Sequence, residues 1–369
     1  FACRIVVVDC VRARSLSLLI LASCDGATGA ARALARADAI AKDSACKICL
    51  VLSEHARIVS KGDRGLVDES PFVARDGAGN VWAGRGRTLD VYSPAGDFIG
   101  SFGRDGAAAG EFRYTGPMYA DRNGDIHIFD SMLGRETVVS SRLQLKSVRP
   151  VPGGINKVVS SRNDALVFVN TVHSDSTGTA FLVHLVGPTG IMRSFAKAPL
   201  NGSSATLERN IATDVFGRLF VGERYAPTID IYEQNERIPT RITLPVSWDA
   251  PRDGDPRNMP SSDLAGLVQD MVVDQRGLLK VIVWEPKDDW KSNATEFRGP
   301  GGEKMYREKD YTVSWYRSSV LLVDVATKRV LDQQFSSVPL WGFLDTESAF
   351  GYAYDTRGQP ELVLFDVKY

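Results

Sequence analysis

The sequence predicts an all-β fold built from one repeating unit of about four strands. Three observations lead to this prediction. After residue 48, apolar and polar residues alternate with a period of two, and turn residues recur every ~8–12 residues. Each unit begins with a short apolar run, an Asp or small polar residue, a turn and a glycine. No amphipathic helical period of useful length appears in this part of the chain.

The overall charge argues against one class of partner. The chain has 369 residues and a formal net charge of -1, without any run of five or six like charges. A protein that binds nucleic acid needs a basic face, so we expect no nucleic-acid partner. The length allows either two or three ordinary domains or one large repeat domain.

Residues 1–24 have the layout of an export signal with a lipobox. Arg12 and Arg14 precede an apolar run over 15–22, and the run ends in the letters LASC, with Cys24 last. That run is shorter than the ~20 residues that a membrane-spanning helix needs. We expect Cys24 to carry the lipid of a bacterial lipoprotein, and the membrane to be contacted only through this anchor. The alternative is an apolar N-terminal helix with an incidental cysteine.

Residues 25–45 are rich in alanine and small residues, which predicts a flexible or weakly helical tether. All five cysteines lie before residue 50, which points to processing and local bridging rather than a disulfide-framed core. Cys46 and Cys49 form a CxxC that is expected to be a small disulfide if the chain is exported. In a reducing compartment, a metal or redox site is the alternative, although no second CxxC supplies further ligands.

The repeating unit recurs six times between residues 70 and 369. In each turn, Asp is expected to cap the backbone with its side chain and glycine to accept a positive φ. The first halves of the units lie at 73–82, 119–127, 158–167, 211–221, 271–279 and 341–354, and the third lacks the glycine. The second halves include strands at 88–92, 181–185, 228–232, 320–324 and 361–365.

Four strands in about 40–60 residues fit a propeller blade, so we expect residues 46–369 to form a six-bladed β-propeller. The last unit has three obvious strands, and an isolated strand lies at 48–59. We expect this N-terminal strand to complete the last blade and close the ring, because closure leaves no open sheet edge.

The first two units resemble a known family. The stretch from Gly96 to Phe112, in which Phe102-Gly103-Arg104 leads to Gly110-Glu111-Phe112, resembles the blade junction of NHL-type six-bladed β-propellers. The lipobox followed by a propeller is similar to bacterial cell-envelope propeller lipoproteins. The resemblance implies a binding site at one end of the central channel, formed by loops that leave the inner strands.

The candidate binding residues follow from that implied position. They are Arg85, Arg87, Asp130, Arg135, Glu223, Arg224, Trp284 and Glu285, and Asn170 occupies a comparable place. Converging Arg and Glu side chains with a Trp are suited to a small anionic or peptide-like ligand. The alternative is that these are solvated loop charges that pair across blades.

Some enzymes share the resembled fold, namely amidating lyases, streptogramin lyases and lactonases, and the lyases use a metal or His cluster. The four histidines here are His55, His127, His173 and His184, and they do not occupy equivalent places in the units. We therefore expect structural histidines, no catalytic residues and no cofactor. His127 and Asp130 are the weak candidates for a calcium or zinc ligand.

Two further stretches each have a structural and a functional interpretation. Asp121-x-Asn123-x-Asp125 partly matches a calcium loop but lacks its glycine and distal glutamate, so a capped turn is expected. The polar insertion over 287–310 is expected to be a mobile loop, whose Trp290, Phe297 and Tyr306 help to cover a ligand or grip a partner.

The sequence as a whole predicts a monomeric, non-enzymatic binding propeller on the bacterial cell envelope, facing the periplasm or the cell surface. Its partner would be a protein or a small anionic or peptide-like ligand. One alternative is a lyase or lactonase-like hydrolase with a metal in the central channel. A soluble periplasmic or secreted propeller is the other.

Overall fold

A computed structural model describes the chain from residue 48 onward, with gaps. The described residues are 48–59, 72–160, 166–174, 176–187, 190–198, 208–233, 236, 238–246, 248, 264–298, 304–309 and 314–369. They lie in one compact unit, Ile48–Tyr369. No helix in these residues is long and apolar enough to cross a membrane. The predicted signal, Cys24, the tether and Cys46 lie outside the described residues, so those expectations stay predictions.

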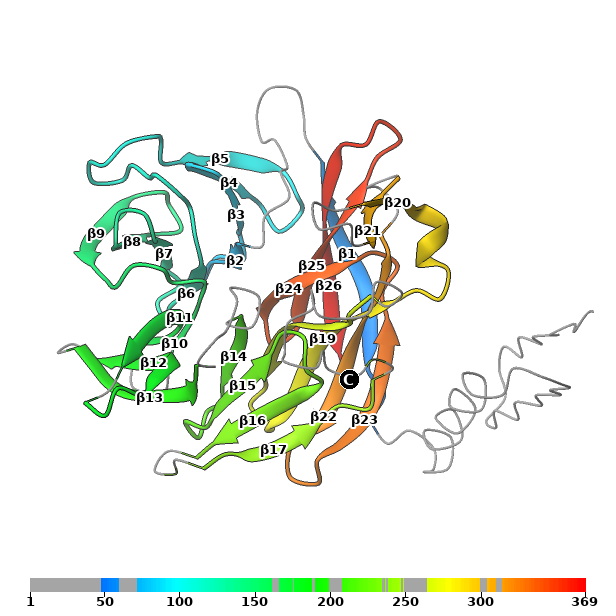
Figure 1. Cartoon of the computed structure of the whole chain (residues 1–369). Helices are drawn as coiled ribbons and strands as arrows, with labels where there is room; N and C mark the ends of the chain where they lie inside the picture. Colours follow the sequence, from blue (N-terminus) through cyan, green and yellow to red (C-terminus); the bar gives the residue numbers. More distant parts are fainter. Residues whose placement is uncertain are drawn as a thin grey trace, which may run out of the picture. The chain divides into compact units, whose positions relative to one another are not determined.

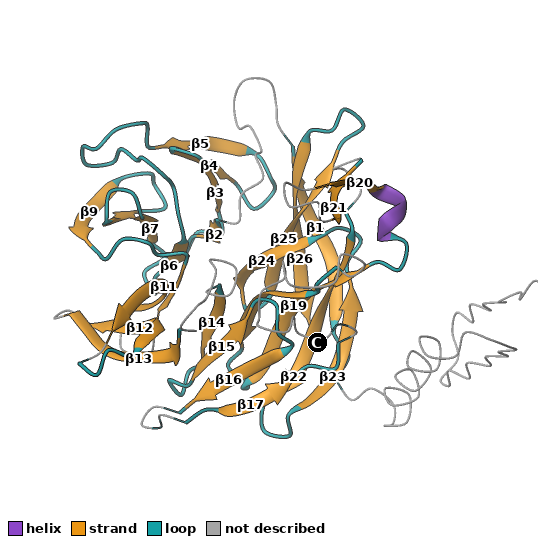
Figure 2. Ribbon diagram, viewed as in Figure 1, coloured by secondary structure: helices purple, strands orange, loops and turns teal. Residues whose placement is uncertain are grey.

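The described residues form six four-stranded antiparallel sheets (Figures 1 and 2). The first two sheets are β2 (Val73–Arg75), β3 (Val81–Arg85), β4 (Thr88–Tyr92) and β5 (Phe98–Phe102), then β6 (Met118–Ala120), β7 (Ile126–Asp130), β8 (Arg135–Val139) and β9 (Leu145–Pro150). The third and fourth are β10 (Lys157–Ser160), β11 (Leu166–Ser174), β12 (Ala180–Gly187) and β13 (Gly190–Lys197), then β14 (Arg209–Thr213), β15 (Leu219–Glu223), β16 (Thr228–Tyr232) and β17 (Thr240–Thr243).

The last two sheets use the remaining long strands. They are β18 (Leu267–Val273), β19 (Leu278–Pro286), β22 (Tyr316–Asp324) and β23 (Arg329–Phe335), then β24 (Leu340–Asp345), β25 (Ser348–Tyr354), β26 (Pro360–Lys368) and β1 (Val51–Ile58). Within the described part of the chain, one 3-10 helix, η2 (Trp290–Asn293), is the only helical element.

The six sheets surround a central channel. The first strands of successive sheets contact one another in the order β2, β6, β10, β14, β18 and β24, and β24 contacts β2. Apolar side chains fill the space between neighbouring sheets, as where Val91 and Trp82 of one sheet pack with Ile126 and Ile128 of the next. Each sheet buries both of its faces against a neighbour, so its central strands are apolar on both sides, as at Val281, Ile282 and Val283 of β19, all fully buried.

The N-terminal strand completes the last sheet. β1 pairs with β26 in antiparallel register, with Val51 opposite Lys368 and Ile58 opposite Leu362. Ile58 is fully buried and packs with Leu362, Leu364 and residues of the first sheet. The lone strand that the sequence places at 48–59 therefore joins the chain's last strand, as its isolation predicts.

The repeated Asp turn has the predicted capping geometry. In the turn after β2, Asp76 Oδ1 accepts hydrogen bonds from the N–H groups of Ala78 and Asn80, both at 2.9 Å, and Gly79 adopts φ 85°. The same pattern recurs at Asp121, Asp214, Asp274 and Asp355, each followed three residues later by a glycine with positive φ. The calcium-like stretch at Asp121 is one of these turns.

The insertion between β19 and β22 is more ordered than the sequence suggests. It contains η2 and a hairpin of β20 (Ala294–Arg298) and β21 (Lys304–Glu308). Trp290 is buried, with its ring 5.1 Å from that of Tyr306 and 5.3 Å from that of Trp315. The expectation of a mobile loop is wrong for these residues, because the aromatic rings pack on one another and hold the hairpin.

Candidate functional site

A cavity of about 360 Å³ lies at one end of the central channel. Most of its lining comes from the first strands of all six sheets and the segments that lead into them, and Arg224 after β15 and Phe350 of β25 complete it. The lining residues are Phe72, Val73, Pro117, Met118, Asn156, Lys157, Val158, Glu208, Arg209, Asn210, Arg224, Gln269, Asp270, Trp341, Gly342, Phe343 and Phe350. The size is at the lower end of the ~300–1,000 Å³ range of small-molecule pockets.

The topology explains why these residues meet. Five of the first strands begin at or beside the cavity and run away from it, while β18 passes the cavity within the strand. Each first strand pairs antiparallel with the second strand of its sheet. The start of the first strand and the end of the second strand therefore lie at the same end of the channel, as where Val73, the first residue of β2, is opposite Ala83 of β3. Polar residues at the starts of the first strands therefore face a common space.

An ion pair crosses the channel. Lys157 of β10 donates from Nζ to Asp270 Oδ1 of β18, although β14 separates these two strands around the ring. Asp270 also accepts hydrogen bonds from the N–H groups of Met271 and Phe343, both at 2.8 Å. Burial lowers the pKa of Lys157 to about 7. The Asp270 carboxylate acts in the opposite direction, because it favours the charged form of Lys157.

Two arginines lie beside this pair on the fourth sheet. Arg224 donates from Nη1 to the Glu208 carboxylate, and its buried Nε has no hydrogen-bond partner among the described residues. Arg209 is 7% exposed in its side chain and lies 3.6 Å from Glu223, and burial lowers its pKa. A buried donor without a partner is costly, so the Nε of Arg224 is a place where a ligand oxygen would be stabilised.

Two side-chain amides that line the cavity donate hydrogen bonds to backbone carbonyl groups. Asn210 donates from Nδ2 to Val268 O at 2.6 Å, and Gln269 donates from Nε2 to Trp341 O at 3.3 Å. The Gln269 Oε1 is buried and accepts no hydrogen bond from the described residues. The cavity thus offers an unused acceptor near the unused donor of Arg224.

Of the residues predicted from the sequence, Arg224 lines this cavity. Arg85 and Arg87, at the turn between β3 and β4, pair instead with Asp90 at 3.1 Å and Asp105 at 2.5 Å. Arg85 ends β3, the second strand, and Arg87 lies in the turn that follows it. These two pairs lie within the first sheet and the loop after it, rather than between blades as the alternative expects.

Asp130 and Arg135 organise the turn between β7 and β8. Asp130 is fully buried and accepts from four backbone N–H groups at 2.8–3.2 Å, those of Arg113, Tyr114, Met132 and Leu133. Arg135 donates to the backbone oxygens of Ala107, Ala108 and Glu111, which belong to the glycine-rich crossing after β5. These contacts give both residues a structural role.

The other three predicted residues lie outside the cavity lining, and two of them contact residues that line it. Glu223 faces Arg209 at 3.6 Å, and Arg317 lies 3.6 Å from the nearly buried Glu285. Trp284 donates to Leu340 O at 2.6 Å and packs its ring against Trp341, which does line the cavity. Asn170 and His173 lie in β11, and their side chains are outside the described residues.

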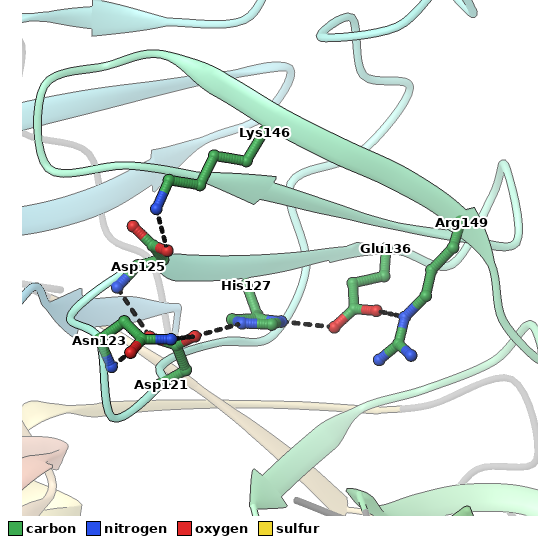
Figure 3. A network of polar contacts seen from close by, with 7 residues as sticks. All are labelled: Asp121, Asn123, Asp125, His127, Glu136, Lys146 and Arg149. Carbon is green, nitrogen blue, oxygen red and sulfur yellow. Dashed lines mark hydrogen bonds and ion pairs between the residues drawn. The ribbon is translucent and has the colours of Figure 1, made fainter. Parts of the chain in front are cut away.

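A second polar cluster lies within the second sheet (Figure 3). His127 stacks on Tyr119, and its Nδ1 is 2.6 Å from Glu136, a fully buried carboxylate that also accepts from Arg149. The other ring nitrogen of His127 lies 3.5 Å from Asp121. Burial acts to raise the pKa of Glu136, but the hydrogen bonds from His127 and Arg149 outweigh it and hold the pKa below its ordinary value.

This cluster links the four strands β6, β7, β8 and β9, and it includes one predicted metal candidate, His127. The other candidate, Asp130, is engaged by backbone N–H groups as described above. Across the described ranges, no group of three or more His, Cys, Asp or Glu side chains is placed to hold a metal ion. His184 bonds to Ser194 at 2.9 Å, and His55 is 3.9 Å from Asp366. Cys49 is exposed.

Comparisons with known proteins bear on the fold. No protein-family model matches the chain, and no curated protein matches it in sequence. A protein from Bacteroides fragilis that is described as exported is 12% identical, with 88% of this chain and 97% of that chain aligned and a TM-score of 0.55. A DUF4221 family member from Bacteroides vulgatus is 8% identical, with 88% and 99% aligned and a TM-score of 0.58.

The fold is a β-propeller. The all-β class and the propeller architecture that the sequence predicts are thereby confirmed. A virginiamycin B lyase from Staphylococcus aureus aligns over 85% of the propeller chain and 99% of its own at 10% identity. Its TM-score of 0.45 is too low to carry any argument about activity.

Proposed function

We propose that this propeller is a non-enzymatic binding protein that holds a small anion in the channel cavity. The observation that carries the proposal is the buried Nε of Arg224, which has no partner among the described residues, in a cavity that Lys157 also lines. Charge-assisted hydrogen bonds to a carboxylate are about twice as strong as neutral ones, so an anion would be favoured there. The ligand would bind to one propeller monomer, and no nucleic acid is expected.

Calorimetry with a small carboxylate tests this proposal. Arg224→Gln should weaken binding by about 10–100-fold, which corresponds to the ~1.5–3 kcal/mol of a hydrogen bond to a charged group. The control is Arg357→Gln, since Arg357 is on the turn between β25 and β26, is 78% exposed and pairs with Asp355. Equal losses in the two variants, or unchanged binding in Arg224→Gln, would contradict the proposal.

The six sheets are, in this proposal, the blades of one six-bladed ring of the NHL type, closed by β1. Metal analysis of the purified protein separates the binding proposal from the enzyme alternative. One equivalent of tightly held zinc or calcium that is lost in His127→Ala or Asp130→Asn would favour a lyase or hydrolase with a channel metal. A metal-free protein that still binds the anion supports the binding function.

The location follows from the predicted lipobox. We propose that the propeller is held at the bacterial cell envelope by lipid on Cys24, and that Cys46 and Cys49 form a local disulfide. The structural similarity to a protein described as exported agrees with this location. Radiolabelled palmitate should label the wild type and not Cys24→Ser. Labelling of both proteins would place the lipid on another residue, and labelling of neither would favour a soluble periplasmic or secreted propeller.

A further inference from the structure

The channel cavity is divided into a polar half and an apolar half. The polar half comes from β10, β14 and β18, which are consecutive around the ring, and from the end of β15. Its residues are Asn156, Lys157, Glu208, Arg209, Arg224, Gln269 and Asp270. The apolar half comes from β24, β2 and β6, which complete the ring; it contains Phe72, Met118, Trp341 and Phe343. A ligand that fills the space must therefore be polar at one end only.

The polar half presents one edge of an arginine. Because Nη1 of Arg224 is bound to Glu208, the opposite edge, formed by Nε and Nη2, remains for a ligand. A guanidinium edge of this kind holds a carboxylate through two parallel hydrogen bonds. Lys157 lies on the neighbouring strand with one of its three N–H groups used by Asp270. The head group that fits this edge is a carboxylate.

The charges of the lining favour a single negative charge. Three cations, Lys157, Arg209 and Arg224, face two carboxylates, those of Asp270 and Glu208. Glu223, outside the lining, lies 3.6 Å from Arg209 and balances it, so these six groups carry no net charge when all are ionised. A monoanion therefore adds one negative charge to the site, whereas a phosphate ester with two charges would add two, which is costlier.

The polar half also offers an acceptor. Gln269 uses its Nε2 on Trp341 O, which leaves Oε1 as the buried atom without a donor. Arg224 is near Gln269, because the N–H of Val268 donates to Arg224 O at 2.7 Å. A ligand would satisfy both side chains if it carried an N–H group close to its carboxylate.

The apolar half is held rigid by packing behind it. The Trp341 ring has the rings of Trp284 and Tyr352 at 5.8 and 5.6 Å, both in edge-on arrangements. The Phe72 ring has Tyr114 at 5.9 Å. A fixed aromatic wall favours an aromatic or branched apolar side chain, which buries its surface without ordering the wall.

Building on the proposed anion site, we propose that the cavity binds an N-acylated apolar α-amino acid, which is the chemistry of a peptide's carboxyl-terminal residue as well. The carboxylate would lie on the free edge of Arg224 near Lys157. The amide N–H would donate to Gln269 Oε1, and the side chain would contact Phe72 and Trp341. Two of the ligand's groups thus meet protein atoms that have no partner among the described residues, Arg224 Nε and Gln269 Oε1.

Four probes on the unmodified protein test this assignment by calorimetry. N-acetyl-L-phenylalanine carries all three groups, whereas N-acetyl-L-phenylalaninamide lacks the carboxylate, 3-phenylpropionate lacks the N–H, and acetate lacks both the N–H and the side chain. We expect N-acetyl-L-phenylalanine to bind at least about tenfold more tightly than each of the other three, since each lost group leaves a buried partner unsatisfied or a wall uncovered.

Variants assign each preference to its residue. Arg224→Gln should abolish the preference for the acid over the amide, and Gln269→Leu should abolish the preference over 3-phenylpropionate. Phe72→Ala, or the gentler Phe72→Leu, should reduce the preference over acetate. Arg357→Gln should leave all three preferences unchanged. The probe series on the wild type decides the matter even where a variant does not fold.

The outcomes separate this inference from the function on which it depends. If acetate and 3-phenylpropionate bind as tightly as N-acetyl-L-phenylalanine, the ligand class is overturned while the anion site stands. If none of the acids binds at millimolar concentration, both proposals are overturned. A peptide ending in Gly-Gly-Phe that binds as tightly as N-acetyl-L-phenylalanine would identify a peptide terminus as the source, and much weaker binding would identify the free acylamino acid.

Discussion

At the scale of single residues, the channel cavity brings together charged side chains from strands of different sheets. Lys157 and Asp270 reach toward each other from non-adjacent strands, and Asp270 is held by two backbone N–H groups. A carboxylate with these partners is fixed in position, so it orients the ammonium. The pair leaves the guanidinium of Arg224 as the group that can accept a new partner without breaking the existing contacts.

The charge of Lys157 should make anion binding depend on pH. Burial lowers the pKa of Lys157 to about 7, although Asp270 favours the ammonium. The other charged groups that line the cavity are Arg209, Arg224 and Glu208. As the pH rises through 7 the ammonium loses its proton, so affinity for N-acetyl-L-phenylalanine should fall between pH 6 and 8.5 by up to about tenfold. Calorimetry across this pH range measures the change in affinity.

A variant isolates the titrating group in that experiment. Lys157→Arg keeps its charge over the whole range, because the guanidinium does not deprotonate in proteins. Its affinity should therefore stay constant between pH 6 and 8.5. The same decline in Lys157→Arg as in the wild type would show that another group is responsible, and a flat wild-type profile would show that Lys157 stays charged or lies outside the binding contact.

At the scale of elements, the second sheet shows how polar side chains stabilise strand pairing. Tyr119 is opposite His127, and Glu136 is opposite Arg149. The contact between His127 and Glu136, which are diagonal neighbours, joins the two pairs into one connected row across β6, β7, β8 and β9; Figure 3 shows its last three members. Glu136 is the centre of the row and is fully buried. Its two partners make it a buried charge whose removal leaves their donors unsatisfied.

We therefore expect Glu136→Gln to lower the free energy of unfolding at pH 7 by about 1–3 kcal/mol. The pKa of Glu136 is below its ordinary value in the folded protein, so its contribution is present above pH ~4.3 and is lost as the pH falls through the folded pKa. The variant should consequently lose less stability on acidification than the wild type. Urea denaturation at pH 7 and at about pH 4 measures both effects.

Glu54→Gln is the matched control for this prediction. Glu54 is 40% exposed in its side chain and pairs with Arg57 on the surface. Exposed pairs contribute ~0–1 kcal/mol, so this variant should differ little from the wild type at either pH. An equal loss in the two variants would mean that burial of the Glu136 row contributes nothing specific.

At the scale of the whole molecule, the last sheet joins the two ends of the described chain. β1 supplies the fourth strand beside β26, and Ile58 connects this strand to the core between the last sheet and the first. An open edge at this place would expose unpaired backbone groups and the apolar side chains of β26. The pairing is therefore expected to stabilise all the sheets, since each one packs on two neighbours.

Ile58→Ala should lower the free energy of unfolding by about 2–5 kcal/mol, because it leaves a cavity in a fully buried position. Val51→Ala on the same strand is the control, as Val51 is 53% exposed and should change the stability little. Chemical denaturation of both variants gives the comparison. A small effect of Ile58→Ala would mean that β1 contributes little to the folded propeller.

The sequence predicts much of this fold because its turns have a local cause. An Asp followed by a glycine three residues later produces the same hydrogen bonds at Asp76 and Asp274, whatever the neighbouring strands contain. Alternation then indicates which strands follow. The insertion at 287–310 departs from its prediction because its order depends on ring packing between Trp290, Tyr306 and Trp315, which are far apart in sequence.

The candidate site was predictable in part. Reasoning from loop position pointed to the end of the channel where the cavity lies and named one lining residue, Arg224, but most of the residues that it chose lie at the ends of second strands, outside the lining. Sequence reasoning missed three pairs of polar residues, one at or near the start of each of three successive first strands. These pairs lie at 156–157, 208–209 and 269–270. Alternation alone cannot show that these side chains meet, because that depends on how the sheets are arranged.

The pairing of β1 with β26 has a consequence for the order of events in the cell. The sheet that it completes needs residues from near both ends of the described chain, and contacts over so many intervening residues form slowly. During synthesis, β1 therefore has to wait without its partner until residues 360–368 have left the ribosome. For a protein that crosses a membrane as an unfolded chain, this delay is useful, since the ring cannot lock before translocation is complete.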